Sequence, residues 1–121
     1  MLFLNAEIEE ALKTDSALIQ LLGDELIYEL YEAGDRYIEY PRVIFEEISN
    51  VPAHSSDNAE KISRITYRIS VCAETKLIEI INAVERVMIS INFVRHSSEP
   101  IRDLPLGTSG RVILFITIKE C

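Results

Sequence analysis

Apolar and polar side chains alternate with a period of two over residues 61–73, which is typical of a strand with one buried face. Residues 42–50 alternate less regularly, and the pair Glu46 and Glu47 indicates a bulge. Residues 51–60, between the two segments, are rich in Pro, Ser, Asp and Asn, as a solvated loop is. These segments predict one long β-hairpin. Its second strand has a buried face of Ile65, Tyr67, Ile69 and Val71, and a solvent face of Arg64, Thr66, Arg68 and Ser70.

Two further stretches have the periodicity of amphipathic helices. Asn5 stands at the N-cap position of the first, and Gly23 at its C-terminal stop. Residues 14–16 all prefer capping positions and are expected to interrupt this helix. We expect Thr75 to cap the second helix, which ends near Ile91. The buried stripe of that helix is Leu77, Ile80, Ile81, Val84, Val87, Met88 and Ile91.

The remaining pattern predicts three more strands. A short one is expected near residues 25–30, and two longer ones at 93–101 and 111–121, with a Pro- and Gly-containing loop over 103–110. The predicted order is α-β-β-β-α-β-β. Strands grouped around one strong helix favour an α+β fold with a mainly antiparallel sheet of about four to five strands. A chain of 121 residues fits a single domain.

The last predicted strand is apolar on both faces. Ile113 and Phe115 point to one side, because strand side chains alternate, and Val112, Leu114, Ile116 and Ile118 point to the other. Such a strand either lies between two layers or presents its second face to another subunit. Because one helix covers only one face of a sheet, contact with another subunit is favoured. We assign Ile113 and Phe115 as candidate contact residues.

The composition favours a folded protein, since 48% of the residues are hydrophobic. The net charge is −8, and residues 1–50 hold 12 acids against three bases, whereas residues 51–121 hold 8 acids against 9 bases. Nucleic-acid binding needs clustered Lys and Arg, so it is excluded as the main function. The acidic half either keeps the protein soluble, repels DNA or steers docking onto a basic partner.

No segment predicts export or membrane insertion. The apolar runs are shorter than the roughly 18 residues of a membrane helix, and the first residues lack the basic region of a signal peptide. The two cysteines, Cys72 and Cys121, form no disulfide framework, which fits a reducing cytoplasm.

No motif predicts catalysis, a metal or a cofactor. His54 and His96 have no metal-ligand spacing, and no signature places either beside Cys72, which we interpret as a packing residue. The glycines of residues 106–110 lack the lysine and the following helix of a phosphate-binding loop. We therefore expect that the protein is not an enzyme.

Two features favour contact with protein. Tyr31, Tyr37 and Tyr40 lie in a tyrosine-rich segment, and tyrosine is enriched at interfaces, although these rings could instead cover one end of the core. The tip of the predicted hairpin, residues 50–58, is either an ordinary surface loop or an arm that becomes ordered on docking.

In this order of elements the chain resembles the tail-completion proteins of long-tailed bacteriophages and prophages, which include the tail terminators. The resemblance covers roughly residues 11–119. One departure is the segment 30–40, which is acidic and tyrosine-rich where such sequences often carry Gly and Pro. The segments that carry the resemblance are Ala-Leu-Ile-Gln-Leu-Leu-Gly at 17–23, Tyr-Pro-Arg-Val-Ile-Phe at 40–45, Ile-Thr-Tyr-Arg-Ile-Ser-Val at 65–71, the helix over 77–88 and the two final strands.

The resemblance implies a structural virion protein that forms a ring, commonly of six subunits, on the end of the tail tube. The ring stops tube growth and joins the tube to the head while leaving a passage for DNA. The implied partners are further copies of the chain, the tube protein and the head connector proteins; DNA passes without specific binding, and no membrane is involved. The implied location is the virion tail, after assembly in the host cytoplasm. Asp57, Arg64 and Arg68 are expected near the contacts of the hairpin.

A different class of function stays open at this point. The chain could be a small ligand-binding or regulatory α+β domain that acts as a homo-oligomer, or an enzyme subunit whose site forms between chains.

Overall fold

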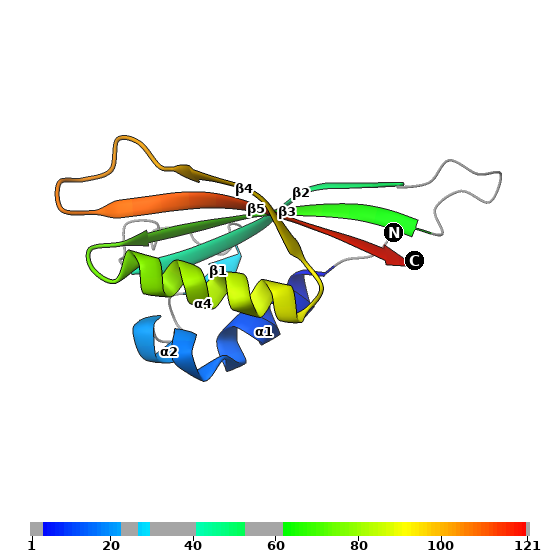
Figure 1. The fold of residues 1–121 in the computed structure, drawn as a ribbon, viewed down its shortest axis with the longest axis horizontal. Helices are drawn as coiled ribbons and strands as arrows, with labels where there is room; N and C mark the ends of the chain where they lie inside the picture. The colour runs from blue at the N-terminus through cyan, green and yellow to red at the C-terminus, as the bar shows by residue number, and fades with distance from the viewer. Residues whose placement is uncertain (1–3, 23–26, 30–40, 53–61, 121) are drawn as a thin grey trace.

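The computed structural model describes residues 4–22, 27–29, 41–52 and 62–120. Within them a five-stranded sheet carries three helices on one face, which confirms the predicted α+β class (Figure 1). The elements are α1 (Asn5–Thr14), α2 (Ser16–Leu22), β1 (Ile27–Glu29), β2 (Arg42–Pro52), β3 (Ile62–Ala73), α4 (Leu77–Ser90), β4 (Val94–Pro100) and β5 (Ser109–Glu120).

The strand order in the sheet is β1-β2-β3-β5-β4. The predicted hairpin is confirmed, because β2 and β3 pair antiparallel, with a register shift between Glu47 and Ser49 where the bulge was expected. β5 pairs antiparallel with both β3 and β4 and so lies inside the sheet. β1 runs parallel to β2, and the sheet is therefore mixed. The hairpin tip lies outside the described residues.

The first predicted helix is two helices, because Asp15 leaves the helical conformation. The interruption at residues 14–16 is thus confirmed. Asp15 caps α2: its Oδ2 accepts a hydrogen bond from the backbone N–H of Leu18 at 3.0 Å. The prediction for Asn5 is wrong, since Leu4 occupies the N-cap position and Asn5 begins the helix. The Asn5 side chain instead accepts a hydrogen bond from the Tyr67 hydroxyl, a tertiary contact that overrides the local preference.

The apolar stripe of α4 packs on the sheet as its periodicity predicts. Ile80, Val84, Val87 and Met88 are all buried. The predicted cap is wrong, however, because the N-cap residue is Lys76 rather than Thr75, and it makes no side-chain capping bond. Lys76 has a φ of 61°, in the left-handed region, which turns the chain sharply from β3 into α4.

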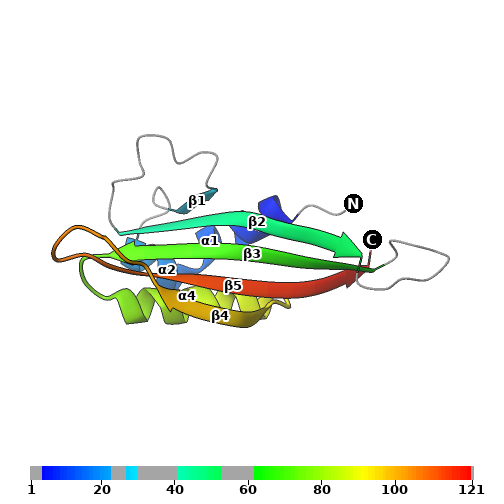
Figure 2. The same ribbon diagram turned by 90° about the horizontal axis from the view of Figure 1, so that it is seen from above.

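The hydrophobic core lies between the helices and the face of the sheet that they cover. The alternation predicted for β3 is confirmed, because Ile65, Tyr67, Ile69 and Val71 are all fully buried. Tyr67 packs edge-to-face against Phe93, with ring centroids 5.9 Å apart at an interplanar angle of 88°. In the described part of the chain, all helices lie on this side of the sheet (Figures 1 and 2).

Candidate protein-contact surface

The face of the sheet that points away from the helices is the candidate site, and we call it the outer face (Figure 1). Strand pairing aligns its side chains in rows across the sheet, because paired residues share a face. The rows, ordered from the hairpin end towards the β4–β5 loop, are Val51, Arg64 and Ile118; Ser49, Thr66, Ile116 and Val94; Glu46, Arg68, Leu114 and Ser97; and Ile44, Ser70, Val112 and Glu99.

The hairpin end of the outer face is open and apolar. Val51, Val94 and Ile118 are 47%, 63% and 64% exposed. Arg64 is also exposed and lies between Val51 and Ile118 in the pairing register. Apolar side chains around one cation fit a protein partner better than a small polar ligand.

The middle of the outer face carries an ion pair across two strands. The guanidinium of Arg68 on β3 donates to the Glu46 carboxylate on β2, including a bond of 2.6 Å from Nε. Both residues lie in the row of half-buried Leu114. The ion pair holds two charged groups in place on a surface that has both apolar and polar side chains. An exposed ion pair of this kind adds little to the stability of the fold.

The other end of the outer face is covered by the loop of residues 101–108. Ile101 and Leu104 of this loop line a groove of about 310 Å³, whose floor includes Arg42, Cys72 and Val112. The loop packs closely on the sheet here, because a Cβ added to Gly110 of β5 would lie 3.0 Å from Cδ1 of Ile101. This end of the face is therefore closed by the chain itself, unlike the hairpin end.

The groove at Cys72 holds no activated nucleophile. Cys72 is 1% exposed, and burial raises the pKa of its thiol, an effect that the nearby Arg42 only partly offsets. A thiol with a raised pKa stays protonated at neutral pH and reacts slowly. Its position beneath the loop agrees with the interpretation of Cys72 as a packing residue.

The two faces of β5 have roles opposite to those predicted. Ile113 and Phe115 are 0% exposed, because they point towards the helices and belong to the core. They cannot contact another subunit as surface residues, so their assignment is corrected. The side of β5 on the outer face is formed by Val112, Leu114 and Ile116, which are half-buried, and by exposed Ile118. The candidate contact surface on this strand is therefore the other apolar set.

Of the other predicted contact residues, Arg64 and Arg68 both lie on the outer face, four residues apart on β3. Tyr31, Tyr37, Tyr40 and Asp57 lie outside the described residues. His96 is exposed on β4, at a register shift in its pairing with β5.

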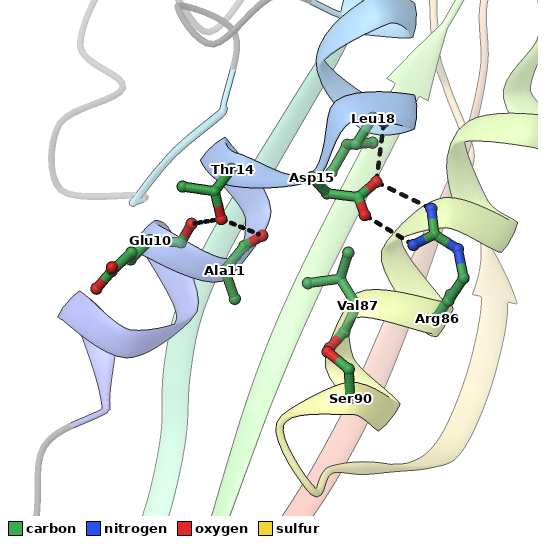
Figure 3. Close-up of polar contacts among 8 residues, drawn as sticks. All are labelled: Glu10, Ala11, Thr14, Asp15, Leu18, Arg86, Val87 and Ser90. Atoms are coloured by element: carbon green, nitrogen blue, oxygen red, sulfur yellow. Dashed lines mark hydrogen bonds and ion pairs between the residues drawn. The ribbon is translucent and has the colours of Figure 1, made fainter.

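The helix layer offers a second surface, a groove of about 750 Å³ between α2 and α4. Beside it, Asp15 joins the two helices through bonds of 2.7 and 2.9 Å from both terminal nitrogens of Arg86 (Figure 3). The hydrogen bond from Arg86, helped by that from Leu18, lowers the pKa of Asp15 although partial burial opposes it. The groove therefore lies between helices that are fixed relative to each other.

Within the described ranges, no group of three or more His, Cys, Asp and Glu side chains could hold a metal ion. None of the helices in these ranges has the length and apolar content that crossing a membrane requires.

No protein-family model matches the sequence, and no curated protein matches it. Among solved structures, a chain of the virion of a native gene transfer agent particle does match. The two chains are 15% identical, and the TM-score is 0.73 over 98% of this chain and 95% of the other. This chain shares the fold of a virion chain. At such low identity the likeness establishes the fold, and the contacts must be argued from the residues.

Sequence reasoning missed two residues of the outer face, Val51 and Val94, and it placed Ile118 on the second apolar face of β5 without naming it as a contact. The sequence pattern places Val51 in a loop and Val94 in a mainly polar strand, because a single apolar residue in a polar segment gives no periodic signal. Only the pairing register places Val94 in the row of Ile116, and Val51 in the row of Ile118.

Proposed function

We propose that this chain is a structural protein of a phage-like virion and that it completes the tail. The observation that carries the proposal is the fold it shares, over nearly the whole of both chains, with a chain of the gene transfer agent virion. The resemblance of the order of elements to tail-completion proteins, argued from the sequence, supports the same role.

In this role, copies of the chain form a ring, commonly of six, at the end of the tail tube. The ring stops tube growth and joins the tube to the head. A closed ring needs two different surfaces on each subunit, since its contacts are head-to-tail. The open outer face and the helix layer, on opposite sides of the sheet, supply two such surfaces (Figure 1).

The shape and charge of the molecule support this role. The end of β2 and the start of β3 lie at one end of the long axis and the β4–β5 loop at the other, so one subunit can reach the tube at one end and the head at the other (Figure 2). The net charge of −8 disfavours phosphate binding, so DNA would pass through the ring without being held by counterion release. The expected partners are the tube protein and the head connector proteins, assembled in the host cytoplasm.

The proposal is tested by deleting the gene from its phage or prophage and imaging the particles by electron microscopy. We expect tubes of uncontrolled length and heads without joined tails, and the wild-type gene supplied in trans should restore normal particles. A variant that lacks residues 53–58, between β2 and β3, should fold but fail to restore joining. Normal joined particles in the absence of the protein would contradict the proposal.

A further inference from the structure

The loop between β4 and β5 presents a leucine that the fold leaves fully exposed, Leu106. The loop has a defined shape, because the Thr108 N–H donates to the Pro105 carbonyl at 3.0 Å and the Ile101 N–H donates to the Gly110 carbonyl at 3.0 Å. A preformed loop loses less conformational freedom when it binds than a flexible one. The structure thus presents Leu106 at the tip of a loop already shaped for contact.

The groove between α2 and α4 is suited to receive an apolar side chain. Ala17, Leu21 and Ala83 contribute apolar surface to its lining, and the two alanines leave room above the helices. The charged residues of its lining are Lys76 and Glu79, both exposed, and Arg86, which is paired with Asp15. Its volume of about 750 Å³ exceeds what one leucine fills, so the neighbouring loop residues can enter with it.

The charges of the loop complement those of the groove. Arg102 and Asp103 precede the leucine and are exposed, so the loop carries one cation and one anion. Glu79 and Lys76 offer the opposite partner for each. Opposite charges can therefore pair when the loop of one copy enters the groove of another.

Loop and groove cannot meet within one chain. Both lie at the same end of the long axis, but the loop extends from the sheet while α2 and the start of α4 lie beneath it (Figure 1). If a second copy is placed with its helix layer against the outer face of the first, in the same direction, its groove lies at the end of the molecule where the first copy has its loop. Such a contact joins two different surfaces and can repeat around a ring.

We propose that the β4–β5 loop of one copy inserts Leu106 into the α2–α4 groove of the next copy. The inference rests on the proposed function, because it names the contact by which the subunits of the ring join. It places the outer face of each subunit against the helix layer of its neighbour.

The first test is crosslinking between separately purified full-length chains, each carrying the substitution Cys121→Ser. One chain carries Leu106→Cys and the other Ala17→Cys, and a short thiol-specific crosslinker is added to the mixture. The matched control replaces the second chain by one with Ala6→Cys, an exposed alanine on α1 in the same layer. Cys72 is buried and does not compete. We expect a crosslinked dimer from the first mixture and background from the second.

The second test uses assembled particles in which the only copy of the chain carries Leu106→Cys, Ala17→Cys and Cys121→Ser. A ladder of crosslinked multimers is expected, since the two cysteines of one chain lie on opposite sides of the sheet. Particles that contain the chain but give only monomers would overturn the inference and leave the proposed function intact.

If the chain is absent from particles, the proposed function fails and the mixture of purified chains decides the inference alone. Equal crosslinking to Ala17→Cys and Ala6→Cys, or none to either, would then overturn it. A Leu106→Ser variant, with an unchanged melting temperature because the side chain is exposed, should lose the ability to restore joining. Full activity of that variant would also count against the inference.

Discussion

At the scale of single residues, Asp15 connects the helices of the helix layer through its side chain. Its carboxylate caps α2 by accepting from the Leu18 N–H, and it also binds Arg86 on α4 (Figure 3). Because Asp15 is also the C-cap residue of α1, this one residue links all three helices. The sequence predicted the interruption at residues 14–16, since these residue types prefer caps. It could not predict the partner, because Arg86 is 71 positions away along the chain.

Replacing Asp15 by alanine removes both the cap and the ion pair. We expect Asp15→Ala to lower the free energy of unfolding by about 1 kcal/mol through the lost cap, measured by urea denaturation. Asp15→Asn is the matched control, because asparagine caps as well as aspartate but carries no charge. It should destabilise less than alanine; equal losses from the two variants would show that the cap contributes nothing.

The same carboxylate predicts a dependence of stability on pH. Bonding to Arg86, chiefly, lowers the pKa of Asp15 in the folded protein, so its ionised form stabilises the fold. The contribution is present above the ordinary aspartate pKa of about 3.9 and is lost as the pH falls through the lower folded value. The difference in stability between wild type and Asp15→Asn should be constant from pH 5 to 8 and shrink below about pH 4. A difference that grew on acidification would contradict the assignment.

Cys72 gives a prediction that bears on catalysis. Because burial raises the pKa of its thiol, a Cys121→Ser variant should react slowly with a thiol reagent at pH 8 and fully only after denaturation. Spectroscopic titration with an aromatic disulfide measures both rates. Rapid reaction of the folded protein would reveal an accessible, activated thiol and reopen the enzymatic alternative.

At the scale of elements, β5 shows what a sequence pattern can and cannot decide. The pattern of residues 111–121 predicts a strand that is apolar on both sides, and the structure agrees. The pattern does not tell which side faces the helices, because Ile and Phe on one face and Val, Leu and Ile on the other are equally suited to a core. The larger Phe115 lies in the core, and the row that ends in Ile118 stays open.

The two faces of β5 predict different responses to truncation. Phe115→Ala creates a cavity in the core and should lower the free energy of unfolding by about 3–5 kcal/mol. Ile118→Ala, on the exposed outer face, should change it by less than about 0.5 kcal/mol. Both values come from chemical denaturation of the monomer. A large loss from Ile118→Ala in that state would mean that the chain itself covers the outer face.

Other elements differ in how far they could be predicted. Apolar residues recur with a period of two in β3 and of 3.6 in α4, and one face of each packs on the core. The sequence pattern therefore predicted both the type of each element and the side that is buried. The short strand expected near residues 25–30 is present as β1, but its parallel pairing with β2 is a long-range contact that leaves no local signal. Asn5 and Thr75 failed as caps because a tertiary bond to Tyr67 and a left-handed Lys76 set the two helix starts.

At the scale of the whole molecule, the fold is one layer of helices on one side of a sheet, with the other side left partly open (Figure 2). The net charge of −8 disfavours contact with DNA. The apolar residues at the open end of the outer face lie in adjacent rows around Arg64. In the proposed function, these properties serve contacts between proteins rather than the stability of the monomer. Changes on the outer face should therefore affect particles more than folding.

A charge placed on the open end of the outer face tests this expectation. We expect Ile118→Lys and Val94→Lys to leave the melting temperature of the purified chain nearly unchanged, because both side chains are more than half exposed. Both should reduce the number of joined particles in a complementation assay, since each buries a charge at the contact. Glu79→Lys would test the opposite layer, and normal joining by all three variants would exclude both surfaces.

The most direct measurement is a cryo-electron microscopy map of the junction between head and tail in complemented particles. The account predicts a ring of this fold around an open channel at the end of the tube. In it, the outer face of each subunit should lie against the helix layer of the next, with Ile118 covered. A junction without this fold, or a ring in which the outer face of every subunit stays in solvent, would contradict it.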